Sequence, residues 1–225
     1  MSAQQTLTVG HRATRIHLAQ PRERATAGVV VLHPWWGLNE DITSFTERLA
    51  DEGFAAAAPD LYDGNVAATI DEAEQLNSEL NEDAADATVL TTVDELGGVI
   101  GDPGARIGVV GFSMGAAWAI WLPAQRREVV ASVLYYGSIE GPSLTRARTP
   151  VLGHFAETDP YEPDENLATF ERTLRTARRD VEIHRYPGTG HWFAEPSQDA
   201  YVPAAADLAF DRTVAFLRRH LVDAG

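Results

Sequence analysis

Gly111-Phe112-Ser113-Met114-Gly115 places a serine between two glycines, directly after a β-branched apolar run and before an apolar helical pattern. A serine on such a strand-to-helix turn projects its hydroxyl beyond the edge of a sheet, where it serves as a nucleophile. The backbone N–H of Met114, at the helix N-terminus, would face the negative charge that develops on an attacked carbonyl. The alternative is a glycine-rich turn in which Ser113 merely caps the helix.

A serine nucleophile needs a base, and seven histidines compete for that role. His191 lies in the glycine-rich loop 186–191, between the last expected strand and the last expected helix, so it is the candidate base. His17, His154 and His184 fall within expected strands, where a structural histidine is the simpler interpretation. Because the base must also be reachable from the serine, a loop that follows a strand is the better position for it.

The base in turn needs an orienting acid, which lies between the serine and the histidine in the chain order of α/β hydrolases. Asp159 directly follows an expected strand and is the candidate, with a turn aspartate before proline as the alternative. Asp164 is expected to cap a helix, and Asp180 is expected to pair with the neighbouring arginines.

The segment 33–39, His-Pro-Trp-Trp-Gly-Leu-Asn, follows an early buried strand and is the expected source of the second oxyanion donor. Proline has no N–H, so Pro34 cannot donate, whereas Trp35 can. Two adjacent tryptophans at the end of a strand cannot both enter the core. We therefore expect at least one, provisionally Trp36, to line a substrate pocket.

Short apolar runs that alternate with helical patterns must position these residues. The expected strands are 28–32, 54–59, 106–112, 129–136, 150–156 and 181–186, and the expected helices are 42–52, 71–96 with a break near 81–83, 114–122, 166–179 and 204–220. This alternation predicts an α/β fold with a mostly parallel sheet and helices on both faces. No repeat or linker interrupts the 225 residues, so we expect one domain over 1–225 without a separate lid.

Composition excludes several kinds of chemistry. The chain has no cysteine, and its 18 basic residues are all arginine, so thiol nucleophiles, cysteine-based zinc sites, Schiff bases and a P-loop lysine are excluded. The net charge is −15, which disfavours nucleic acid and membrane surfaces as partners. Between Trp35 and Ala105 there are 17 acidic residues and one arginine, Arg48. A solvated face is the simple interpretation, and a role in selecting substrate charge is the sharper one.

The N-terminus has neither a basic start nor a long apolar stretch, and the apolar runs are too short to span a membrane. We therefore expect a cytoplasmic monomer or small homo-oligomer that acts on a small molecule, without a metal or an organic cofactor.

Together these motifs resemble the dienelactone hydrolase family of small α/β hydrolases. The resemblance spans nearly the whole chain and is carried by 33–39, by 111–115, by Glu-Thr-Asp at 157–159 and by Gly-His-Trp-Phe at 190–193, with Tyr-Tyr-Gly at 135–137 as a further match. It implies hydrolysis of esters or lactones. We expect the pocket to include Tyr136, Trp192, Phe193 and Glu195 beside Trp36.

The chain departs from the best-known members of the family at three points. Those members use a cysteine where this chain has Ser113, and they carry a glutamate at the position of Pro34. They also clamp a substrate carboxylate with arginines, one of which corresponds to Glu195 here, and no arginine lies between Arg48 and Arg106. A carboxylate beside Glu195 would be repelled, so we expect neutral substrates.

These features predict a serine hydrolase of small carboxylic esters or lactones. One alternative is a peptidase or acyltransferase that uses the same triad, because the fold does not distinguish these reactions. A second alternative is a binding protein that retains the fold without catalysis.

Overall fold

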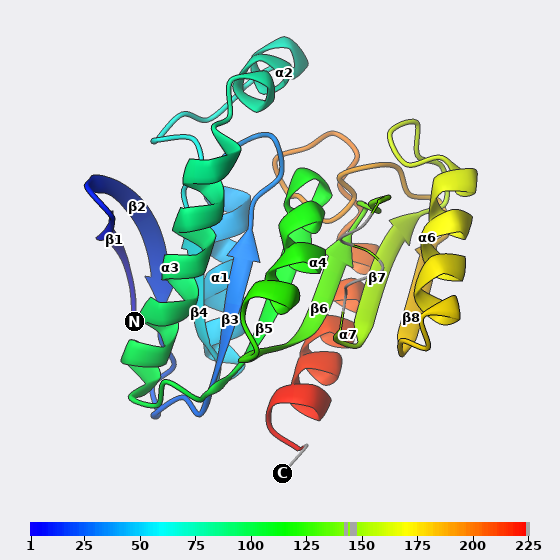
Figure 1. Cartoon of the computed structure of the whole chain (residues 1–225). Coiled ribbons are helices and arrows are strands. Elements are labelled where there is room, and N and C mark those ends of the chain that lie inside the picture. The colour runs from blue at the N-terminus through cyan, green and yellow to red at the C-terminus, as the bar shows by residue number, and fades with distance from the viewer. Residues whose placement is uncertain (142–143, 145–147, 224–225) are drawn as a thin grey trace. The chain divides into compact units, whose positions relative to one another are not determined.

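The computed structural model describes residues 1–141, 144 and 148–223, and its contacts divide the chain into two compact units. Unit 1 comprises Met1–Ile107 and unit 2 comprises Gly108–Gly225. Figure 1 shows both, and each is described by itself below. That the two units form one domain stays a prediction.

The strands of unit 1 combine an antiparallel hairpin with a buried parallel pair. Strands β1 (Ser2–Val9) and β2 (Arg12–Ala19) form the hairpin, β2 pairs antiparallel with β4 (Ala55–Pro59), and β4 pairs parallel with β3 (Ala27–Leu32). Every residue of β3 and β4 is buried, as expected for a parallel pair covered on both faces. A strand around His17 was expected and corresponds to β2, whereas β1 and the hairpin that it forms were not among the expected elements.

Three helices of unit 1 begin at side-chain caps. They are α1 (Glu40–Asp51), α2 (Ile70–Ser78) and α3 (Glu82–Ile100). Asn39, Thr69 and Asn81 each accept a hydrogen bond from a backbone N–H of the first turn, which satisfies a donor that the helix cannot pair itself. The acidic region expected as one interrupted helix therefore forms two helices, separated at 79–81.

The strands of unit 2 lie in the order β5-β6-β7-β8. They are β5 (Arg106–Phe112), which begins at the end of unit 1, β6 (Val129–Tyr135), β7 (Val151–Ala156) and β8 (Val181–Tyr186). The pairs β6–β7 and β7–β8 are parallel. The prediction of an α/β fold with a mostly parallel sheet is confirmed.

Helices cover both faces of the unit 2 strands (Figure 1). The helices are α4 (Ala116–Gln125), α6 (Asp164–Thr176) and α7 (Pro203–Leu221). On β6, the hydroxyl of Ser132 donates to α4 at 2.8 Å, whereas the hydroxyl of Tyr135 lies 2.9 Å from that of Thr213 on α7. Residues an odd number apart on a strand point to opposite faces, so α4 and α7 lie on opposite faces of β6.

One predicted helix end was wrong. The helix expected over 114–122 was to end before Pro123, but α4 continues to Gln125 with Pro123 inside it. Proline lacks the N–H that would pair with the carbonyl of Ala119. That carbonyl instead accepts the hydroxyl of Ser132, at 2.8 Å, so β6 supplies the donor that the proline removes.

Within the residues that the structure describes, no helix has the length and apolar character needed to cross a membrane.

Candidate active site

The candidate nucleophile occupies a strained turn. Ser113 follows β5 and opens a short 3-10 turn, Ser113–Gly115, with φ of 46°. Left-handed φ is unfavourable for a residue that carries a Cβ, and such strain is concentrated at functional sites. A Cβ on Gly111 would lie 2.4 Å from the carbonyl oxygen of Gly115. Glycine at 111 is therefore required by the close approach of strand and helix.

A second glycine packs against the backbone of the serine. Gly137 follows β6, and a Cβ there would lie 2.5 Å from the carbonyl oxygen of Ser113 and 2.8 Å from the Cβ of Ala116. The preceding residue, Tyr136, has φ of 39° and donates its N–H to the carbonyl of His154 at 2.7 Å. The loop after β6 is thus held directly against the serine turn. The sequence indicated this segment only through the family resemblance.

The structure brings Ser113, His191 and Asp159 together. The hydroxyl of Ser113 lies 3.1 Å from Nε2 of His191, and Nδ1 of His191 lies 2.7 Å from Oδ2 of Asp159. The side chains of His191 and Asp159 are only 5% and 3% exposed, whereas Ser113 is half-buried. A shielded acid and base next to a reachable hydroxyl are what nucleophilic catalysis requires.

Asp159 is held by backbone donors as well as by the imidazole. Its Oδ1 accepts the N–H groups of Tyr161 at 2.9 Å and Glu162 at 3.0 Å. One oxygen is thereby fixed by the loop, and the other is aimed at His191. The competing acid Asp164 instead pairs with Arg185 at 2.7 Å, and Asp180 immediately precedes β8.

The other histidines that the sequence singled out have different partners. His154 is fully buried on β7, with Nδ1 2.7 Å from the hydroxyl of Tyr186 and Nε2 3.0 Å from that of Thr213. Burial lowers the pKa of His154 well below its ordinary value, and His184 and Arg212 nearby lower it further. His154 is therefore a neutral structural histidine.

In unit 1, His33 is also a structural histidine. Its Nε2 accepts the N–H of Leu61 at 3.2 Å, so its Nδ1–H donates to the carbonyl of Pro34 at 2.7 Å. Burial lowers the pKa of His33, although the hydrogen bond to Pro34 opposes the shift. Both ring nitrogens are therefore used by the backbone around β3.

Aromatic rings surround the imidazole of His191. The ring centroids of Tyr136, Tyr161 and Trp192 each lie 5.0 Å from that of His191. Tyr136 is 1% exposed and Phe193 is fully buried, whereas Tyr161 is 46% exposed. Tyr136 and Phe193 thus support the site from inside, and Tyr161 is its outward-facing ring. Tyr161 was missed because no periodic pattern marks a residue of an irregular loop.

The carboxylate of Glu195 lies inside unit 2. Glu195 is 1% exposed, and its Oε1 accepts the hydroxyl of Tyr136 at 2.7 Å. Glu195 therefore does not point to solvent. Because Tyr136 also contacts His191, Glu195 is joined to the candidate site through one tyrosine ring.

The two expected oxyanion donors belong to different units. Met114 follows Ser113 at the start of the turn that leads into α4. In unit 1, the N–H of Gly37 donates to the carbonyl of Pro34 at 3.1 Å, which closes a tight turn around Trp35 and Trp36. Trp36 is buried and Trp35 is half-buried, so Trp35 is the more accessible ring. The roles of Trp35 and Trp36 stay predictions.

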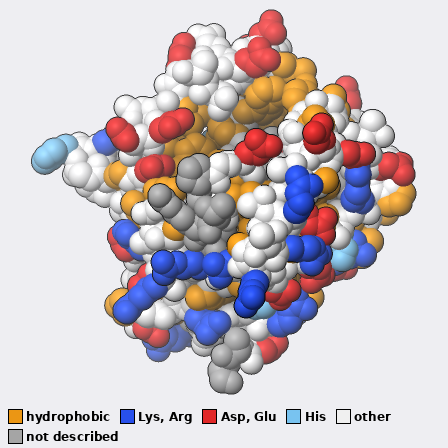
Figure 2. All heavy atoms as spheres, turned by 45° about the vertical axis from the view of Figure 1, so that its right-hand side comes forward, with side chains coloured by type: hydrophobic (Ala, Val, Ile, Leu, Met, Phe, Trp, Pro, Cys, Tyr) orange, Lys and Arg blue, Asp and Glu red, His pale blue; other side chains and the backbone are white. Residues whose placement is uncertain are grey.

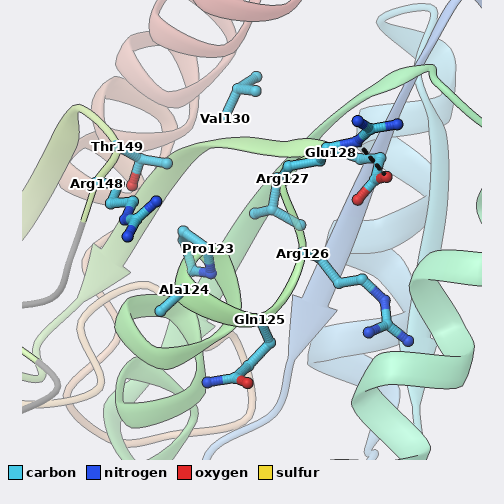
Figure 3. Close-up of a pocket in the computed structure, with 10 residues that line it drawn as sticks. Pro123, Ala124, Gln125, Arg126, Arg127, Glu128, Val130, Arg148 and Thr149 are labelled. Carbon is cyan, nitrogen blue, oxygen red and sulfur yellow. Dashed lines mark hydrogen bonds and ion pairs between the residues drawn. The ribbon is translucent and has the colours of Figure 1, made fainter.

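A separate hollow lies in unit 2 between the end of α4 and the start of β6 (Figure 3). Its volume is about 570 Å³, and its lining includes Arg126, Arg127 and Arg148. Figure 2 shows arginines close together on the face that it draws. In Figure 3, however, the three guanidinium groups point in different directions, and Arg127 pairs with Glu128 at 3.4 Å. The hollow contains none of the candidate catalytic residues.

Comparison with known proteins defines the class. The fold of the chain matches a crystal structure of a putative dienelactone hydrolase from Klebsiella pneumoniae with a TM-score of 0.87 and 22% identity, over 98% of this chain and 99% of the other. The chain therefore has the α/β hydrolase fold.

The family follows from sequence. The model of the dienelactone hydrolase family matches residues 15–221. The chain is 31% identical to protein usf of Aquifex pyrophilus over 86% of this chain and 88% of that protein. It is 30% identical to a putative carboxymethylenebutenolidase of Aquifex aeolicus over 92% of this chain and 94% of that protein. The chain belongs to the dienelactone hydrolase family and is a hydrolase.

Proposed function

We propose that this hydrolase cleaves small carboxylic esters or lactones with Ser113 as the nucleophile. The observation that carries the proposal is the continuous set of contacts from the Ser113 hydroxyl through His191 to Asp159, at 3.1 and 2.7 Å. These distances lie within the range over which protons are transferred. Similarity to a relative described as a putative carboxymethylenebutenolidase supports lactones as one substrate class.

In the proposed reaction, the oxygen of Ser113 attacks the substrate carbonyl while Nε2 of His191 takes the hydroxyl proton. Asp159 holds the imidazole in the tautomer that keeps Nε2 free to accept. The N–H of Met114 stabilises the oxyanion. The tetrahedral intermediate expels the alcohol, which takes its proton from His191, and leaves an acyl group on Ser113. Water activated by His191 then releases the acid.

We further propose that the preferred substrates are neutral. Glu195 stands where the family resemblance expects an arginine, and its buried carboxylate is one tyrosine ring away from His191. Two like charges repel each other more strongly in a shielded site than in water. A substrate carboxylate would therefore be disfavoured near Glu195.

The test is a kinetic comparison of p-nitrophenyl butyrate with the p-nitrophenyl monoester of succinic acid, together with a small neutral lactone. We expect kcat/KM to be about tenfold or more higher for the neutral ester, which corresponds to about 1.4 kcal/mol. Ser113→Ala should abolish hydrolysis of both esters. Failure of the wild-type protein to hydrolyse any of the three compounds would reject the proposed activity.

Glu195→Gln tests the charge argument separately. The amide oxygen still accepts the Tyr136 hydroxyl while the charge is removed, so the preference for the neutral ester should narrow severalfold. The matched control is Glu165→Gln, which removes a charge from an exposed position on α6. Equal kcat/KM for the neutral and the anionic ester in the wild type, unchanged in Glu195→Gln, would contradict the selection for neutral substrates.

A further inference from the structure

Glu162 makes an unusual set of contacts for a half-buried loop carboxylate. Its Oε2 accepts the backbone N–H of Ser138 and its Oε1 accepts the hydroxyl of Ser138, both at 2.6 Å. Its own backbone N–H donates to Oδ1 of Asp159 at 3.0 Å. One residue therefore binds the loop after β6 through its side chain and the candidate acid through its main chain.

These contacts close a ring around the candidate triad. Ser138 follows Gly137, which packs against the backbone of Ser113 so closely that a Cβ would lie 2.5 Å from the serine carbonyl oxygen. Asp159 bonds to His191, and His191 bonds to Ser113. The positions of nucleophile, base and acid thus depend on one another through the Glu162–Ser138 link.

The link between Glu162 and Ser138 places a charged carboxylate in an unfavourable electrostatic environment. Burial raises the pKa of Glu162, the hydrogen bonds from Ser138 oppose that shift, the charge of Asp159 adds to it, and His191 opposes it. A second carboxylate beside Asp159 lowers the stability of the fold, because the two negative charges repel each other. A neutral side chain could connect the two loops without placing two negative charges near each other, so the arrangement is better explained by the geometry that it imposes on Asp159 and Ser113.

We propose that Glu162 is a positioning residue that clamps the loop of Asp159 to the loop that packs against Ser113, and so sets the alignment of the triad. The inference rests on the proposed serine-hydrolase function. Among the described residues, Glu162 is hydrogen-bonded to Ser138 and Asp159 and not to Ser113 or His191. Its removal should misalign reacting groups that are otherwise intact, and an error of about 1 Å in such groups can lower a rate by about 100-fold.

The test compares Glu162→Ala with Glu162→Gln in the complete chain, on the neutral ester. We expect kcat to fall about 10- to 100-fold in Glu162→Ala, with KM changed by less than about threefold. Glu162→Gln keeps one acceptor oxygen for Ser138, so its kcat should be about tenfold higher than that of Glu162→Ala. Glu165→Ala on the same segment, which is exposed, is the matched control and should leave kcat unchanged.

A readout independent of hydrolysis separates this inference from the proposed function. The proton between Nδ1 of His191 and Asp159 should give a downfield proton NMR signal, identified by its loss in Asp159→Asn. In Glu162→Ala we expect this signal to shift and to exchange faster with water, and in Glu165→Ala to remain as in the wild type. If the wild type hydrolyses no ester, the proposed function is rejected. The NMR signal of the His191 proton still tests whether Glu162 positions Asp159.

Thermal unfolding identifies a variant that has merely lost its fold. If Glu162→Ala does not fold, Ser138→Ala takes its place, because it removes the hydroxyl that donates to Glu162 and leaves the carboxylate in place. An unchanged kcat together with an unchanged imidazole proton signal in folded Glu162→Ala, or in Ser138→Ala where it replaces that variant, would overturn the proposal. A lower Tm with the wild-type kcat and the wild-type signal would also overturn it, because Glu162 would then only stabilise the loop.

Discussion

Two buried histidines of unit 2 lie in different chemical surroundings. His191 sits between the hydroxyl of Ser113 and the carboxylate of Asp159. His154 sits between the hydroxyls of Tyr186 and Thr213, and burial lowers its pKa well below the ordinary value. A neighbouring carboxylate stabilises an imidazolium, whereas two neutral hydroxyls do not. The same residue type is thus suited to proton transfer at one position and to packing at the other.

The backbone around the two histidines also differs. His154 lies within β7, where the ladder to β6 and β8 fixes its position. His191 lies in a loop beyond β8, and its neighbour Trp192 has φ of 64°. Ser113 is likewise left-handed. Left-handed backbone therefore occurs at or beside the candidate catalytic residues, whereas the structural histidine lies in a regular strand.

The largest expected difference between the two regions is in activity. Asp159→Asn should lower kcat by about 10³- to 10⁴-fold, because the amide no longer holds the required tautomer of His191. The free energy of unfolding should change little. Ester hydrolysis and thermal unfolding of purified proteins measure both effects. Asp164→Asn is the matched control, since Asp164 pairs with Arg185 outside the triad, and a comparable loss of kcat there would refute the assignment of the acid.

The three residues of the candidate triad were predictable from the sequence. The order Ser113, Asp159, His191 and the strand before each residue were sufficient to select three side chains that lie together. The hydrogen bonds from Tyr161 and Glu162 to Asp159 were not predictable, because they come from backbone N–H groups, which any residue type except proline supplies. The burial of Glu195 was missed for a related reason, since its partner Tyr136 is 59 residues away.

Elements were missed where the usual signals are weak. The hairpin of β1 and β2 escaped notice because β1 is almost entirely exposed and polar, so no buried face produces an alternating pattern. The helix end at Pro123 was wrong because the donor that replaces the missing N–H comes from Ser132 on another element. Tertiary contacts of this kind leave no local trace in the sequence.

The second expected effect is on stability and belongs to the other histidine. His154→Phe should lower the free energy of unfolding by about 2–3 kcal/mol, because the hydroxyls of Tyr186 and Thr213 lose their partner inside the core. The kcat for the neutral ester should stay within about threefold of the wild type. Urea unfolding at pH 7 measures the change in stability. A large loss of kcat with wild-type stability would show that the two histidines are not separable in this way.

A third, smaller effect is the pH dependence of stability. The folded-state pKa of His154 is lowered, so below about pH 6.5 the unfolded chain binds a proton that the folded protein does not. Stability should therefore fall as pH decreases below that value, by up to about 2 kcal/mol from this group between pH 6.5 and 5. His154→Phe should show a shallower decrease than the wild type. His33 shifts in the same direction, so only the difference between the two proteins isolates His154, and parallel curves would contradict its neutral state.

The smallest expected effect tests the strain at the nucleophile. Ser113→Gly should remove the penalty of left-handed φ and raise the free energy of unfolding by about 1 kcal/mol, after the larger backbone entropy of unfolded glycine is deducted. Ser113→Ala keeps the Cβ and should show no such gain. Both variants should be inactive. Equal unfolding midpoints for glycine and alanine at 113 would argue against stored strain.

The central claim is that Ser113 is a nucleophile activated by His191. The most direct measurement is the reaction of the intact protein with a fluorophosphonate probe, followed by mass spectrometry of its peptides. We predict one adduct, located on Ser113, formed in the wild type and suppressed in His191→Gln although that variant remains folded. Absence of an adduct, an adduct on another residue, or equal labelling in His191→Gln would contradict the account.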